Sequence, residues 1–169
     1  MSYQIRLATL DDVPALGPVE VAAGQLFKTV GMGHLSHKFM EPEMAAAFVR
    51  AKGCFVAEAE DGALAGFAMS SPLDHSVFVH EISVDPAHGR RGIGQRLLNA
   101  VSDWAKALGK PAVTLSTFKD VPWNAPYYGR QGFAVVERED WSPAFFIIHA
   151  HEEESGLPID RRCFMRKEL

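Results

Sequence analysis

The segment Gly89-Arg90-Arg91-Gly92-Ile93-Gly94 combines glycines and arginines directly before a helical pattern. A helix N-terminus presents unpaired N–H groups and a partial positive charge, so it attracts anions, and glycine lets the backbone approach a ligand oxygen. Successive amides of such a turn can face inward as a nest, and arginine adds charge-assisted hydrogen bonds to phosphate. The segment therefore predicts a phosphate site, and the alternative is a solvated turn that caps the helix.

Other sites are disfavoured by what the sequence lacks. The segment has neither the Gly-Lys-Ser or Gly-Lys-Thr of a P-loop nor the G-x-G-x-x-G of a dinucleotide fold close after a strand. The histidines show no four-ligand pattern, so we predict no metal site. Cys54 and Cys163 lie far apart in strand-like sequence, which suits buried reduced thiols better than a disulfide.

The elements that must position this segment follow from hydrophobic periodicity and turn residues. We expect strands over 3–7, 54–59, 63–69, 77–84, 112–117, 133–137 and 162–167. We expect helices over 9–27, 41–53, 92–108, 124–131 and 143–154, with a loop over 31–40. Asp61-Gly62 predicts a hairpin turn, and Ser71-Pro72 is expected to end the strand before it. The order β α α β β β α β α β (α) β indicates the fold class α/β (α+β), a mixed β-sheet with flanking helices.

Composition favours one compact domain over residues 1–169, because 47% of the 169 residues are hydrophobic. A formal net charge of -4 argues against a general nucleic-acid or anionic-membrane binder. No apolar run approaches the ~20 residues of a membrane span, and residues 1–10 lack signal-peptide features. We therefore expect a soluble cytoplasmic protein that binds neither nucleic acid nor membrane.

Two motifs resemble those of one enzyme family. The run from Ile82 to Leu98 resembles the acetyl-coenzyme A motif of the GNAT acetyltransferase superfamily, Q/R-x-x-G-x-G/A, which follows a strand ending in Val-x-Pro. The run from Trp123 to Phe133 resembles the family's second signature, an aromatic-Tyr pair before a short helix that ends in Gly-Phe. The resemblance in element order covers nearly the whole chain. Gly89 stands where the family prefers Gln or Arg, so Arg90 or Arg91 must supply the side-chain charge.

The resemblance implies that acetyl-coenzyme A is the co-substrate. Its pantetheine would lie between two parted strands, 77–84 and 112–117, and pair with the main chain like an added strand. Its diphosphate would rest on the amides of the glycine-rich turn. Asn124 opens the short helix and is either a further coenzyme contact or a simple cap. The implied coenzyme-binding residues are Ile82, Ser83, Val84, Gly89, Arg90, Arg91, Gly92, Ile93, Gly94 and Asn124.

The same resemblance implies three catalytic candidates. Tyr128 matches the family's tyrosine acid, which protonates the departing thiolate, whereas its neighbour Tyr127 is expected to pack. His80 and Glu81 are both candidates for the base, and successive strand residues point to opposite faces, so only one should enter the cleft. Glu81 is narrowly favoured, and each residue also has a structural alternative. A backbone N–H near residues 82–83 would hold the oxyanion.

The resemblance thus implies an acetyl-CoA-dependent N-acetyltransferase that acetylates a primary amine, of a small molecule or a protein, by direct attack in a ternary complex. Glu20 and Glu41 are expected either to border the acceptor pocket or to be solvated. Two alternatives stay open: a non-catalytic acyl-CoA sensor, and an enzyme of the same fold that uses a longer acyl donor. A homodimer is one oligomeric state that we consider.

Overall fold

The computed structural model describes residues 1–169, which form two compact units. The first unit comprises residues 1–71 and 79–104, and the second comprises residues 72–78 and 105–169. The strands are β1 (Tyr3–Leu7), β2 (Cys54–Ala59), β3 (Leu64–Leu73), β4 (Ser76–Val84), β5 (Ala112–Phe118), β6 (Ala134–Val135) and β7 (Arg162–Glu168). The helices are α1 (Val13–Gly24), α2 (Pro42–Arg50), α3 (Ile93–Ala107), α4 (Ala125–Arg130) and α5 (Pro143–Glu154). None of them is long and apolar enough to cross a membrane.

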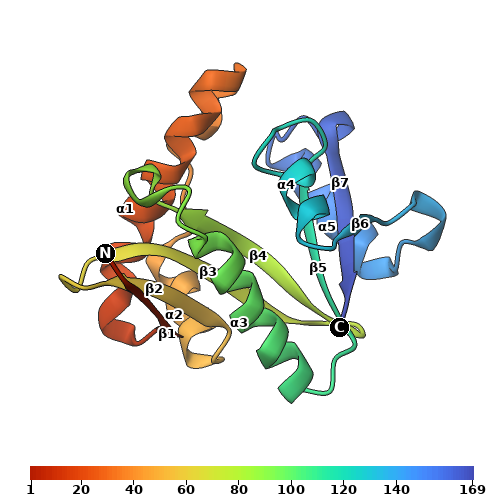
Figure 1. The fold of residues 1–169 in the computed structure, drawn as a ribbon. Coiled ribbons are helices and arrows are strands. Elements are labelled where there is room, and N and C mark those ends of the chain that lie inside the picture. The colour runs from red at the N-terminus through yellow and green to blue at the C-terminus, as the bar shows by residue number, and fades with distance from the viewer. The chain divides into compact units, whose positions relative to one another are not determined.

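In the first unit, β1 pairs antiparallel with β2, and β2 pairs antiparallel with β3 (Figure 1). Val56 and Met69 pack with Leu16 of α1, so α1 and α2 cover one face of these strands. Phe55 points to the opposite face, where its ring meets Trp104 of α3 at 6.2 Å between centroids. Strand alternation therefore separates a face covered by α1 and α2 from a face covered by α3.

In the second unit, β7 lies between β5 and β6 and is antiparallel to both (Figure 1). Phe145 of α5 stacks on Phe164 of β7, with ring centroids 4.2 Å apart and planes 7° apart. Phe78, at the start of β4, joins the same cluster. Helix α5 therefore covers the face of β7 that carries the even-numbered residues.

The expected fold class is confirmed. The strand order is β1-β2-β3-β4-β5-β7-β6, and every expected helix and strand is present in the expected order, including the helix over 143–154. This is the mixed sheet with flanking helices that the sequence predicts.

Several predicted boundaries are wrong. Helix α2 ends at Arg50 rather than near Gly53. Helix α1 ends at Gly24, not Phe27, and continues as 3-10 turns; at Gly24 the chain passes so close to Ser36 that a Cβ would lie 3.2 Å from its carbonyl oxygen. Strand β3 runs on to Leu73, because Pro72 is exposed near the strand's end, where a missing N–H is tolerated. Strand β6 has only two residues, since the chain turns into a 3-10 helix at residue 138.

Candidate functional site

The connection from β4 to α3 is a tight, hydrogen-bonded turn. The Asp85 carboxylate accepts a hydrogen bond from the N–H of Ala87 at 2.9 Å and so caps a short 3-10 helix. The N–H of Gly89 then donates to the carbonyl of Pro86 at 3.0 Å. A Cβ on Gly89 would lie 3.1 Å from that carbonyl oxygen, so a larger residue here would crowd the backbone of Pro86.

The residues that follow alternate in the sign of φ, a pattern typical of an anion nest, and this turn is called the nest below. Arg90 has φ +61° and Gly92 has φ +73°, both in the left-handed region. Residues of opposite backbone handedness in succession turn their N–H groups toward the same side. Ile93 then starts α3 with a buried side chain, and nothing lies within 4 Å of a Cβ placed on Gly92. The positive φ values and the open surroundings of Gly92 are compatible with the phosphate site that the sequence predicts.

The two arginines differ in their contacts. Arg91 donates from Nη1 to the Tyr3 hydroxyl at 2.6 Å. Arg90 is exposed, and its guanidinium makes no hydrogen bond, ion pair or ring contact. Arg90 therefore has its whole guanidinium available for a ligand, whereas Nη1 of Arg91 is already bonded within the chain. Sequence reasoning left both arginines open and missed Tyr3, because a strand residue that lies 88 positions before Arg91 gives no local signal.

On β4, the two candidate bases lie on opposite faces. His80 Nε2 lies 2.7 Å from the Ser71 hydroxyl, and its ring is 5.0 Å from that of Phe48 on α2. The Glu81 carboxylate accepts a hydrogen bond from the Ser83 hydroxyl at 2.8 Å. His80 therefore faces α2, and Glu81 faces the α3 side. Desolvation lowers the pKa of the His80 imidazole below 6.5, which favours its neutral form.

A cavity of about 140 Å³ opens between α1, the segment before α2, and Met69 of β3. Its lining is apolar apart from Glu20, whose carboxylate accepts a hydrogen bond from the N–H of Met40 at 2.8 Å. Burial raises the pKa of this carboxyl group. Met69 and Ser71 project to the same face of β3, so this cavity and His80 share one face of the sheet. Glu41 is exposed and does not line the cavity.

The second unit carries the other predicted residues. Tyr128 of α4 is 7% exposed, and its ring meets Phe133 at 5.8 Å between centroids. Its N–H donates to the carbonyl of Asn124 at 2.9 Å. Asn124 occupies the N-cap position of α4, but its side chain makes no capping hydrogen bond. Burial raises the pKa of Tyr127, which is consistent with a packing role.

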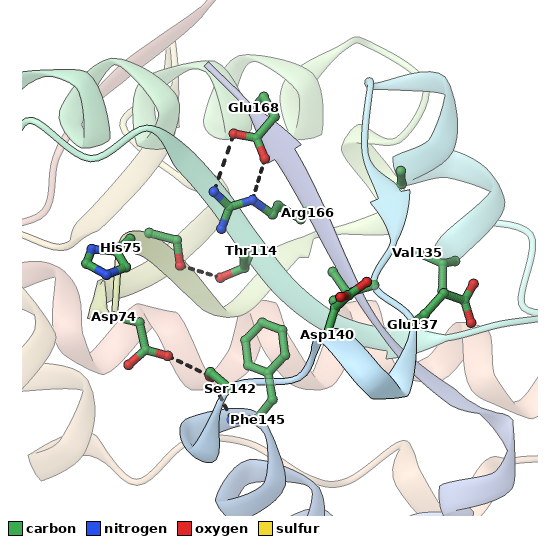
Figure 2. A pocket seen from close by; sticks show the side chains of 13 residues that line it. Asp74, His75, Thr114, Val135, Glu137, Asp140, Ser142, Phe145, Arg166 and Glu168 are labelled. Atoms are coloured by element: carbon green, nitrogen blue, oxygen red, sulfur yellow. Dashed lines mark hydrogen bonds and ion pairs between the residues drawn. The ribbon is translucent and has the colours of Figure 1, made fainter.

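The larger cavity, about 530 Å³, also belongs to the second unit and contains none of the predicted site residues (Figure 2). Asp74 accepts a hydrogen bond from Ser142 at 2.6 Å at its edge, and Arg166 pairs with Glu168. These polar groups are therefore partnered within the chain. No three His, Cys, Asp or Glu side chains converge to hold a metal ion in either unit.

Comparison with known proteins agrees with the geometry. Residues 25–133 match the model of the acetyltransferase (GNAT) family, and the chain belongs to this family. It is 32% identical over 114 residues to streptothricin acetyltransferase of Streptomyces lavendulae, and 34% identical over 113 residues to an uncharacterised protein of Mycobacterium leprae. These matches take in 64% and 62% of the chain, but only 57% and 30% of those relatives' lengths.

The fold extends the similarity to the whole chain. The PaiA N-acetyltransferase of Thermoplasma acidophilum, solved in complex with coenzyme A, superposes with a TM-score of 0.74 over 100% of both chains. Its sequence is 16% identical, so the likeness concerns the fold.

Proposed function

We propose that the chain is an acetyl-CoA-dependent N-acetyltransferase whose two units form one acetyltransferase domain over residues 1–169. The observation that carries this proposal is the anion nest before α3, with Arg90 at φ +61° and Gly92 at φ +73°. It coincides with the acetyl-coenzyme A motif and lies within the matched region 25–133, which includes residues of both units.

The residues around the nest fit coenzyme A as a substrate. The N–H of Gly89 donates to the Pro86 carbonyl, so the amides of residues 90–94 hold the diphosphate, and the free guanidinium of Arg90 adds positive charge. The main chain of residues 82–84 pairs with the peptide-like pantetheine. The Asn124 side chain makes no hydrogen bond within the chain, which supports its role as a further coenzyme contact.

In the reaction, the amine nitrogen attacks the thioester carbonyl, a C–N bond forms, and the C–S bond breaks through a tetrahedral oxyanion. His80 takes the proton from the attacking amine, because its lowered pKa favours the neutral imidazole and Ser71 orients its ring. A backbone N–H near residues 82–83 stabilises the oxyanion. Tyr128 gives a proton to the departing thiolate.

His80 is now favoured over Glu81 as the base. The Glu81 carboxylate accepts the Ser83 hydroxyl and faces the α3 side, whereas His80 shares a face with the Glu20 cavity. The narrow preference for Glu81 in the sequence rested on the family resemblance and on the rarity of a carboxylate in an apolar strand, and the hydrogen bonds support the opposite order.

Glu20 supports a cationic primary amine as the acceptor. A carboxylate in an apolar cavity favours a bound ammonium group, which offsets part of its desolvation. The cavity of about 140 Å³ is small and mostly apolar, which suits a short amine end. We therefore propose a compact primary amine, bound with its nitrogen near Glu20.

Release of free coenzyme A thiol from acetyl-CoA, measured with a panel of primary amines, tests this function. The expected result is thiol release with a matching acetylated product, lost in His80→Ala but not in Arg161→Ala, which alters an exposed ion pair with Asp120. Coenzyme binding with no transfer to any amine would contradict the proposal and favour a sensor. A parallel series with succinyl-CoA tests the longer donor.

A further inference from the structure

We infer that Tyr3 is a positioning residue for the coenzyme-binding turn and that the two arginines have separate tasks: Arg91 holds the turn, and Arg90 attracts the diphosphate. The effect on coenzyme binding rests on the proposed function, but the contacts that support the inference lie wholly within the first unit.

Tyr3 contacts side chains from both ends of the turn. Its hydroxyl lies 2.6 Å from Nη1 of Arg91 and 3.0 Å from Nδ1 of His88. A guanidinium can only donate, so the hydroxyl accepts from Arg91; its own proton lies within reach of His88 Nδ1 and of the Met1 sulfur at 3.2 Å. The two rings meet edge to face, with centroids 5.7 Å apart. Tyr3 is 8% exposed, so this junction is largely buried.

A second contact ties the same strand to α3. Arg96, in the first turn of the helix, donates from Nη2 to the backbone carbonyl of Tyr3 at 2.8 Å. Tyr3 in turn is fixed by the antiparallel pairing of β1 with β2, where it lies opposite Ala59. Positions before, within and after the turn are therefore all attached to one residue of the sheet.

This attachment explains how Arg90 keeps an unfavourable conformation. A residue with a side chain at φ +61° is disfavoured relative to the right-handed region, and it persists only where its surroundings hold it. Arg90 lies between His88 and Arg91, both of which are held by Tyr3. The Tyr3 hydroxyl therefore preorganises the amides, and without it the coenzyme must order the turn as it binds.

The test uses Tyr3→Phe, Arg91→Ala, their double variant and Arg90→Ala, with Arg161→Ala as a control that removes one exposed arginine from the other unit. Phenylalanine keeps the ring and leaves the Arg96 bond to the backbone carbonyl intact. Calorimetry measures coenzyme A affinity at low and at high salt, steady-state kinetics separate kcat from KM, and hydrogen exchange follows the amides of residues 88–92 without coenzyme.

We expect Tyr3→Phe to weaken coenzyme A binding about three- to tenfold, with unchanged kcat and faster exchange in the turn. At high salt, where charge is screened, Arg91→Ala and the double variant should match Tyr3→Phe within about twofold. Arg90→Ala should lose affinity mainly at low salt and leave the exchange unchanged. Arg161→Ala should match the wild type.

Unchanged exchange in Tyr3→Phe, additive losses in the double variant, or equal salt dependence for the two arginine variants would each overturn the inference. Exchange is measured without coenzyme, so it decides the attachment by itself. A wild-type chain that does not bind coenzyme A contradicts the proposed function, and the exchange data still decide whether Tyr3 holds the turn.

Discussion

Replacing Gly92 with alanine separates the conformational role of this glycine from any steric one. A Cβ on Gly92 would meet no atom within 4 Å, but its φ of +73° is unfavourable for alanine. Gly62, in the β2–β3 hairpin, has φ +84° and equally open surroundings, so Gly62→Ala is a matched control outside the turn. Both substitutions therefore introduce the same kind of backbone strain, and only one of them lies in the proposed site.

Holding an L-residue in the left-handed region costs about 1–2 kcal/mol. Both variants should therefore lose about that much free energy of unfolding if the native conformation is kept. If the turn at Gly92 relaxes instead, coenzyme binding must restore the strained conformation, and 1–2 kcal/mol corresponds to roughly a five- to thirtyfold weaker affinity. The expectation is thus weaker coenzyme A binding in Gly92→Ala and unchanged binding in Gly62→Ala.

Isothermal calorimetry with coenzyme A at fixed salt and thermal unfolding of both variants provide the two readouts. Equal affinities in Gly92→Ala, Gly62→Ala and the wild type would refute the reasoning if the unfolding data show Gly92→Ala to be less destabilised than its control, because the turn has then relaxed. The turn would then have changed its conformation without any effect on the ligand, and the nest would not be the binding site.

Three further predictions concern the chemistry. Tyr128→Phe, which keeps the ring contacts, should lower kcat at least about tenfold with little change in coenzyme affinity; an unchanged kcat removes Tyr128 as the acid. A lowered His80 pKa means that the neutral base persists to acidic pH, so kcat/KM should rise with pH through a midpoint below 6.5. His80→Gln should abolish this rise in kcat/KM, and Glu81→Gln should keep it. The reverse result would make Glu81 the base. Glu20→Gln should raise the KM for a cationic amine about tenfold and leave that for acetyl-CoA unchanged, whereas equal changes in both would exclude Glu20 as the ammonium ligand.

Local chemistry made much of the fold predictable. The hairpin at Asp61-Gly62 and the end of α3 at Gly109 both have glycine in the left-handed conformation, with φ of +84° and +69°. Such positions can be recognised from residue type, because glycine alone adopts this region without strain. Boundaries set by tertiary contact were missed, as at Gly24, where the close approach of Ser36 coincides with the end of α1.

The candidate site was likewise predictable only where its features are local in sequence. The glycine-rich turn and its position before a helix were predictable because they are local in sequence. The difference between Arg90 and Arg91 was not, since it depends on Tyr3 from a distant strand. The preference for His80 over Glu81 likewise depends on Ser71. The Glu20 cavity depends on the chain before α2, whose path carries no periodic signal.

The most direct test of the central claim is a titration of the isotope-labelled chain with coenzyme A, followed by the chemical shifts of its backbone amides. We expect the amides of residues 89–94 to shift most and to saturate together. Pantetheine, which lacks the diphosphate, should leave their chemical shifts nearly unchanged. Shifts that centre on the cavity of about 530 Å³ around Phe145, with the turn unaffected, would contradict it.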